Sequence, residues 1–181
     1  MAKALIVFES IFGDNKLLAR AIGRGLSARL EVEIRGVEEA PQTVPDDIDL
    51  LVAGGPTHMT QMSRPTSRKQ VPEHKEGTPV PDSGIREWLT NLPKDKKRGL
   101  KAVAFGTNIG EPSWVKMAGK AAKGIHRRLR RKGFEMVASP EIFLVADPTG
   151  PLIEGEEERA ERLGEQLAAK FEPHRPRPGA G

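Results

Sequence analysis

Three uninterrupted apolar runs constrain the fold of this chain more than any other feature. They cover residues 4–8, 50–53 and 102–105. A strand that is covered by helices on both faces reads as a continuous hydrophobic run, as the strands of parallel sheets do. The sequence therefore predicts a parallel sheet with these three runs as its central strands.

Two weaker strand patterns belong at the margins of this sheet. Residues 30–35 alternate strictly between apolar and charged side chains, so one face of that strand is expected to meet water. The stretch 134–145 carries Pro140, and a central strand does not tolerate a proline in its hydrogen-bonded ladder. We therefore expect an edge strand there, with a break in its middle.

Helical patterns separate the strands. Apolar residues recur at steps of three and four in the stretches 15–28, 85–92, 115–129 and 160–171, whereas the connection 36–47 has room for only a short, irregular helix. This alternation predicts an α/β fold with right-handed crossovers. With the second and fifth strands at the edges, it fits a doubly wound five-stranded parallel sheet of order 2-1-3-4-5, in three α/β/α layers. Ligands of such sheets bind over the carboxyl ends of strands one and three.

A chain of 181 residues suits a single domain, which we place at residues 1–171. Within it, residues 60–82 are rich in proline, serine, threonine and charge and are too long for an ordinary connection, which predicts a mobile loop or an insertion. Residues 172–181 offer no apolar content to bury and predict a disordered C-terminal tail.

The composition excludes several classes of chemistry. The chain has no cysteine, so disulfides, thiolate catalysis and iron–sulfur clusters are excluded, and any redox chemistry must come from a bound cofactor. The four histidines lack the spacing of a zinc site. No apolar run approaches the roughly 20 residues that cross a bilayer, and no signal peptide precedes the first run, so we expect a cytoplasmic protein without a membrane contact. A net charge of +4 and the absence of tyrosine argue against a nucleic-acid partner.

The turn after the first apolar run has the composition of a phosphate site. Ser10, Gly13 and Asn15 combine a hydroxyl, a glycine and an amide between a strand and the start of a helix. The first amides of a helix lack an intrahelical acceptor and lie at the positive end of its macrodipole, so they bind an anion without lysine. Helix caps use the same residue types, so a well-capped helix without a ligand is the alternative interpretation.

This turn resembles the first loop of the flavodoxins and flavodoxin-like FMN proteins. The segment Gly55-Pro56-Thr57-His58 is similar to the Gly-x-Pro-Thr segment of FMN-dependent quinone reductases built on that fold. The resemblance implies a flavodoxin-like fold from residue 2 to about residue 171, with FMN as the cofactor. It also implies that the FMN phosphate is wrapped by the first-loop residues Ser10, Ile11, Phe12, Gly13, Asp14 and Asn15.

The same resemblance assigns the isoalloxazine ring to two further loops. The ring would lie beside Pro56, Thr57, His58 and Met59, and its other side would be lined by Gly106, Thr107, Asn108, Ile109 and Gly110. His58 near the N1 and O2 edge, where ordinary flavodoxins carry acids, would raise the midpoint potential. Two residues depart from the family pattern. Phe12 replaces a hydroxyl, and Asp14 puts a negative charge beside a dianion unless its side chain turns away to cap the helix.

The predicted helix over residues 115–129 carries a basic face. Its cations recur at steps of three and four, opposite the apolar stripe, and are Lys116, Lys120, Lys123, Arg127 and Arg130. Three interpretations stay open at this point: a solvated face, docking to an acidic redox partner, or binding of nucleic acid through phosphates alone.

Two functional hypotheses follow from these patterns. In the first, the chain is a cytoplasmic FMN-binding redox protein that passes electrons to a partner protein or reduces a small-molecule acceptor. No side chain need act as an acid or a base, and the choice between an oxidoreductase and an electron carrier stays open. In the second, a flavodoxin-like domain without flavin is a binding module that acts through the basic helix and residues 60–82.

Overall fold

The structure is a computed structural model that describes residues 1–58, 61–62, 84–95, 99–110 and 120–171. Most of the loop predicted at 60–82, the tail predicted at 172–181 and the predicted site residue Met59 lie outside these ranges. For His58 the structure describes the main chain only.

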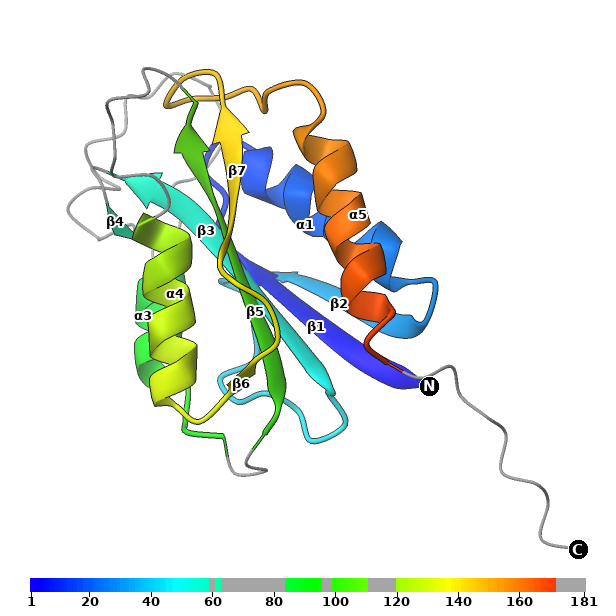
Figure 1. Ribbon diagram of the computed structural model, residues 1–181. Coiled ribbons are helices and arrows are strands. Elements are labelled where there is room, and N and C mark those ends of the chain that lie inside the picture. Colours follow the sequence, from blue (N-terminus) through cyan, green and yellow to red (C-terminus); the bar gives the residue numbers. More distant parts are fainter. Residues whose placement is uncertain (59–60, 63–83, 96–98, 111–119, 172–181) are drawn as a thin grey trace, which may run out of the picture.

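A parallel sheet forms the middle of the molecule (Figure 1). Its central strands are β1 (Ala2–Phe8), β3 (Leu50–His58) and β5 (Lys101–Ile109), and β2 (Leu30–Gly36) forms one edge. At the other edge, β6 (Glu135–Met136) and β7 (Glu141–Val145) both pair with β5. The order β2-β1-β3-β5, followed by β6 and β7, confirms the predicted order 2-1-3-4-5.

Helices cover both faces of the sheet, which confirms the three layers (Figure 1). One face carries α1 (Asp14–Leu26) and α5 (Glu156–Ala168), and the other carries α3 (Ile85–Asn91) and α4 (Lys120–Arg131). Because successive side chains of a strand point to opposite faces, each central strand contributes to two hydrophobic cores. In β1, Ala4 and Ile6 join the core under α1 and α5, whereas Leu5 and Val7 join the core under α3 and α4.

The edge strands follow the sequence pattern closely. In β2, exposed charged residues alternate with more buried apolar ones. On the opposite edge, Pro140 lies between β6 and β7, so the ladder is interrupted at the residue that has no amide hydrogen to donate. The predicted break in the middle of this strand is therefore confirmed.

The connection between β2 and β3 differs from the expectation. Residues 37–47 contain turns but no helix. Pro41 and Pro45 explain this difference, because a proline removes a helical hydrogen bond and disfavours helical backbone in the residue before it. Val37 instead anchors the connection, with its side chain buried in the core and its amide donating to the Phe8 carbonyl at 2.8 Å.

The helices α1 and α5 touch main chain to main chain. A Cβ atom added at Gly164 would overlap the carbonyl oxygen of Ile22, and one added at Gly25 would overlap the carbonyl oxygen of Glu161. Both glycines are thus required for the close approach of two backbones. This contact packs the C-terminal half of α1 tightly against α5.

Of the helices that the structure describes, none has both the length and the hydropathy to span a lipid bilayer.

Candidate functional site

The three predicted loops meet at the carboxyl ends of β1, β3 and β5. The amide of Glu9 donates to the Gly54 carbonyl at 3.0 Å and joins the first two loops. Across the next pair of strands, Pro56 lies in register with Thr107. Asn15 links the first loop to the third, since its Nδ2 donates to Thr107 Oγ1 at 3.3 Å although the two residues are 92 positions apart in the sequence.

The first loop turns sharply at Gly13. Its φ of +101° lies in the left-handed region, which a glycine adopts without the steric penalty of a Cβ. The Gly13 amide donates to Ser10 Oγ at 3.1 Å, so Ser10 shapes the turn as well as facing it. Gly13 is also the N-cap of α1, and its carbonyl accepts from the Leu17 amide at 3.1 Å.

Main-chain donors surround this turn. The amides of Ile11, Phe12, Asn15 and Lys16 have no acceptor among the residues that the structure describes. The side chain of Ile11 is buried in the protein, with 6% exposed, so only its main chain can serve a ligand. Free amides at the start of a helix can bind an anion, and α1 has 13 residues.

Two buried polar atoms at the carboxyl edge of the sheet lack a hydrogen-bond partner in the described part of the chain. Asn15 is 3% exposed, and its Oδ1 makes no hydrogen bond within the described part of the chain. The hydroxyl of Thr57 is likewise buried without a partner. A buried polar group left unpaired costs about 1–3 kcal/mol, so two of them at one edge of the sheet mark a place for a ligand's polar groups.

Asn15 can present either a donor or an acceptor to such a ligand. The hydroxyl of Thr107 both accepts and donates hydrogen bonds. A half-turn of the Asn15 carboxamide would keep its bond to Thr107 and would direct the NH₂ group into the space that Oδ1 now faces. The pair therefore suits a phosphate oxygen in one orientation and a ligand hydroxyl in the other.

Asp14 does not cap α1. The cap position belongs to Gly13, and no side chain caps this end of the helix. The Asp14 carboxylate instead lies against the turn before α5, where a Cβ added at Gly150 would come 2.5 Å from its Oδ2. The residue is the first of the helix, so its negative charge remains beside the free amides even though the side chain points to the neighbouring turn.

The third loop contains glycines that serve packing. A Cβ at Gly106 would lie 2.8 Å from the Gly55 carbonyl oxygen and 3.2 Å from the Ala122 amide nitrogen, so this position is filled by β3 and α4. The Gly110 amide donates to the Val145 carbonyl at 3.0 Å and ties the loop to β7. The residues left to face a ligand are Thr107, Asn108 and Ile109, the last of which is 39% exposed.

A buried carboxylate in the first loop was missed by the sequence analysis. Glu9 is fully buried, and its Oε2 accepts from the Ile85 amide at 2.9 Å at the start of α3. Glu9 therefore links the end of β1 to a helix on the opposite face from α1. Its position, directly after a buried apolar run, is the signal that could have identified it.

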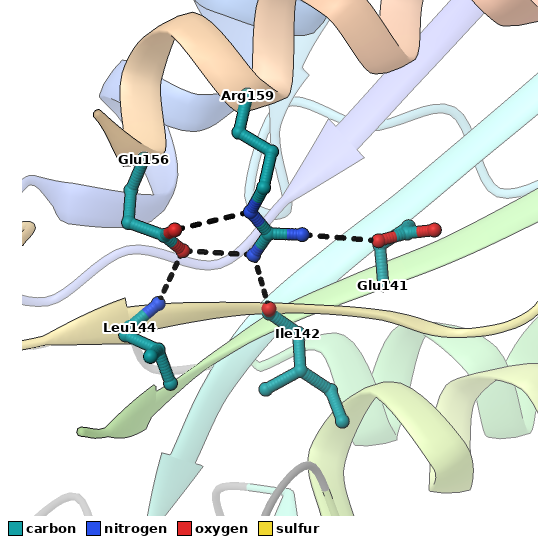
Figure 2. A network of polar contacts seen from close by, with 5 residues as sticks. All are labelled: Glu141, Ile142, Leu144, Glu156 and Arg159. Carbon is teal, nitrogen blue, oxygen red and sulfur yellow. Dashed lines mark hydrogen bonds and ion pairs between the residues drawn. The ribbon is translucent and has the colours of Figure 1, made fainter. Parts of the chain in front are cut away.

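A polar network fastens the far edge of the site. Arg159 of α5 donates two hydrogen bonds to Glu156, at 3.0 and 2.8 Å (Figure 2). It also donates to Glu141 at 3.2 Å and to the carbonyl of Ile142. Glu156 also accepts from the Leu144 amide at 2.7 Å. The network thereby fixes α5 to β7, on either side of the connection that carries Gly150.

The network also sets the ionisation of Glu156. Burial by itself raises the pKa of this carboxyl. The hydrogen bonds from Arg159 and from the Leu144 amide, together with the charge of Arg159, outweigh burial and hold the pKa below its usual value. Glu156 is therefore charged at neutral pH.

Comparison with solved structures identifies the architecture. The flavodoxin 2 of Bacillus cereus, in its oxidised form, matches with a TM-score of 0.64 at 21% identity, over 94% of this chain and all of the other. A flavodoxin from the domain Archaea matches with a TM-score of 0.63 at 21% identity, over 93% and 97% of the two chains. The two-electron reduced flavodoxin of Megasphaera elsdenii matches with a TM-score of 0.58 at 19% identity, over 92% and 98%. This chain therefore has the flavodoxin-like fold.

Sequence comparison alone finds no such likeness: neither a family model nor a curated protein matches the chain.

Proposed function

We propose that this protein binds FMN at the carboxyl edge of its sheet and transfers electrons through it. The observation that carries the proposal is the group of unpartnered polar atoms on Asn15 and Thr57, next to free main-chain amides at the start of α1. The flavodoxin-like fold supports the same position, because doubly wound sheets bind ligands where the strand order reverses, between β1 and β3.

The residues present fit this cofactor. The amides of Ile11, Phe12, Asn15 and Lys16 would hold the phosphate, and the hydroxyl of Thr57 would take a polar group of the ribityl chain. The flavin ring would lie between the loops that follow β3 and β5. When bound, FMN supplies the one-electron and two-electron chemistry, while the protein binds and orients it.

The charge of the site affects the proposed redox role. Asp14 is the first residue of α1, beside the proposed phosphate position, whereas the loop after β3 carries His58 where ordinary flavodoxins carry acids. A neutral or cationic group near the flavin favours the reduced anion. The midpoint potential of the second one-electron reduction of FMN is therefore expected to be less negative than in acidic flavodoxins. A redox titration of the FMN-loaded protein measures it, and an equally low potential would contradict this part of the proposal.

Titration with FMN and with riboflavin tests the site directly. FMN fluorescence should be quenched on binding, and riboflavin, which lacks the phosphate, should bind at least about tenfold more weakly because the amides at α1 have nothing to hold. Equal affinity for the two flavins would be consistent with a site for the flavin ring but would refute the proposed phosphate site. Protein that binds neither flavin would refute the proposal and favour a flavin-free binding module.

A pair of asparagine variants separates the site from general effects. Asn15→Ala removes the buried carboxamide and should weaken FMN binding by about tenfold or more, since a hydrogen bond to a charged group contributes about 1.5–3 kcal/mol. Asn91→Ala changes an exposed asparagine at the end of α3 and should leave the affinity unchanged. Circular dichroism of both variants controls for unfolding.

A further inference from the structure

A groove of about 860 Å³ runs along the outer side of α4. Besides α4, its lining includes Arg86 of α3 and Pro140 from the break between β6 and β7. We call it the basic groove, because six cationic residues line it: Arg86, Lys120, Lys123, Arg127, Arg128 and Arg131. The candidate ligand site lies elsewhere, at the carboxyl edge of the sheet.

The groove differs in part from the face that the sequence predicts. Lys120, Lys123 and Arg127 line it as expected. Arg130 is exposed but is not among its lining residues, and Lys116 lies outside the described part of the chain. Arg128 and Arg131 take part instead, because Arg128 reaches toward α3 and approaches Thr90 Oγ1 at 3.5 Å.

Four cations of the groove lack a carboxylate partner in the part of the chain that the structure describes. Within the described residues, Lys120, Lys123, Arg127 and Arg131 form no ion pair. Some cations elsewhere in the chain are paired with carboxylates, for example Arg24, which pairs with Glu157 and Glu161 at 2.9 and 2.8 Å. A row of like charges at helical spacing destabilises its own helix by a few tenths of a kcal/mol per pair. Such a row is therefore expected to be matched by charge from another molecule.

The groove begins directly behind the candidate site. Near the start of α4, Ala122 packs against Gly106 of β5, whose next residue, Thr107, belongs to the site. From there α4 extends over 12 residues, which is about 18 Å at 1.5 Å per residue. A molecule held along the groove would thus lie close to the carboxyl end of β5.

The spacing of the charges fits a helix better than a nucleic acid. Lys120, Lys123, Arg127 and Arg131 follow one another at steps of three and four, which is the repeat that carboxylates on one face of a helix would present. No phenylalanine, tyrosine or tryptophan lines the groove in the part of the chain that the structure describes, so bases would have nothing to stack on. We propose that the basic groove docks an acidic helix of a partner protein, whether or not FMN is bound.

Two synthetic peptides of identical composition test this proposal. One is an alanine-rich helix with glutamates at steps of four and three along one face, and the other distributes the same glutamates around the helix. Fluorescence anisotropy of the labelled peptides at about 50 mM salt should show tighter binding of the first peptide, with an affinity that falls as salt is added. Equal binding of the two peptides would contradict a groove with helical spacing.

Matched charge reversals locate the binding surface. Lys123→Glu/Arg127→Glu reverses two charges in the groove, and Arg20→Glu/Arg162→Glu reverses two exposed arginines on α1 and α5. Both double variants lower the net charge from +4 to neutrality. The groove variant should bind the striped peptide at least about tenfold more weakly, and the control should change by less than about twofold. Equal losses would show that net charge, and not the groove, attracts the peptide.

Two further experiments test whether nucleic acid or a second copy of this chain occupies the basic groove instead. A single-stranded or duplex 20-nucleotide DNA that bound more tightly than the striped peptide, and lost binding in the groove variant, would overturn the protein partner in favour of nucleic acid. Sedimentation that revealed a dimer abolished by the groove variant would assign the groove to a second copy of this chain. FMN titration of the same variants is a separate readout, so a failure of flavin binding and a failure of peptide docking are distinguishable.

Discussion

At the scale of single residues, the candidate site combines features that favour an anion with one that opposes it. The free amides near Gly13 and the carboxamide of Asn15 suit a phosphate. Asp14, the first residue of α1, brings a carboxylate to the same end of the helix. Its contact with the Gly150 turn directs the side chain aside but does not remove its charge. The affinity of the site is therefore set by a balance that one substitution can shift.

Asp14→Asn is expected to raise the affinity for FMN by about three- to tenfold. The substitution removes repulsion between two anions of the order of 1 kcal/mol near a protein surface. It also removes a favourable charge at the start of α1, so a loss of about 0.3–1 kcal/mol in the free energy of unfolding should accompany it. Fluorescence titration measures the affinity. Riboflavin affinity should stay constant, and a parallel gain for riboflavin would contradict the electrostatic explanation.

At the scale of elements, pairs of segments far apart in the sequence hold the site in shape. The glycine contact joins α1, the helix that follows the first loop, to α5, and the Arg159 network ties α5 to β7. Glu9 adds a third link, from β1 to α3. The first loop and the helix that follows it are thus tied to elements on both faces of the sheet.

Gly164→Ala is expected to destabilise the fold by about 1–3 kcal/mol or more, because the new methyl group would overlap the main chain of α1 at Ile22. Urea denaturation measures the free energy of unfolding. Gln166→Ala, at an exposed position of the same helix, is the control and should change stability by less than about 0.5 kcal/mol. An unchanged free energy of unfolding in Gly164→Ala would mean that α1 and α5 can move apart without loss of stability.

Glu156→Gln is expected to lower stability at pH 7 by about 1–2 kcal/mol, through weaker hydrogen bonds to Arg159 and Leu144. The folded pKa of Glu156 is lower than its ordinary value of 4.5, so the charged form stabilises the fold above that pH. This stabilisation disappears as the pH falls through the folded pKa. The difference between wild type and variant should therefore shrink below about pH 4.5, as denaturation at several pH values would reveal.

A control for this pH dependence comes from the same helix. Glu165 is exposed and forms no ion pair within the described residues, so Glu165→Gln should change the free energy of unfolding by less than about 0.5 kcal/mol. If the difference in the free energy of unfolding between wild type and Glu156→Gln stayed constant with pH, packing and not charge would account for the effect of the substitution.

The sequence predicts elements better than it predicts contacts between them. Continuous and alternating apolar runs identified the strands and their order, and Pro140 located the break between β6 and β7. The bond from Asn15 to Thr107 could not be predicted, because nothing in local periodicity relates residues 92 positions apart. The prediction of a short helix within residues 36–47 was wrong, because Pro41 and Pro45 each remove a helical hydrogen bond.

At the scale of the whole molecule, the flavodoxin-like fold separates two surfaces. The carboxyl edge of the sheet holds the candidate flavin site, and the outer side of α4 holds the basic groove. Because different residues form the two surfaces, the proposed flavin binding and the proposed docking of a partner can be tested independently.

FMN is expected to stabilise the whole molecule through the first of these surfaces. At a free concentration 100 times its Kd, a ligand that binds only the folded state adds about 2.7 kcal/mol to the free energy of unfolding. In a chain of this size that corresponds to a rise in Tm of about 5–10 °C. Differential scanning fluorimetry with FMN, and with riboflavin for comparison, measures the shift. No shift at saturating FMN would indicate that the flavin does not bind the folded protein.

The charged residues along β2 govern how copies of the molecule behave when crowded together. Glu31, Glu33 and Arg35 are exposed on a strand whose outer rim has no neighbour within the sheet of the described residues. A second copy that lengthened the sheet by adding its own β2 would set these ionised groups beside one another across the new pair of strands. Edge-to-edge association through that rim is therefore disfavoured.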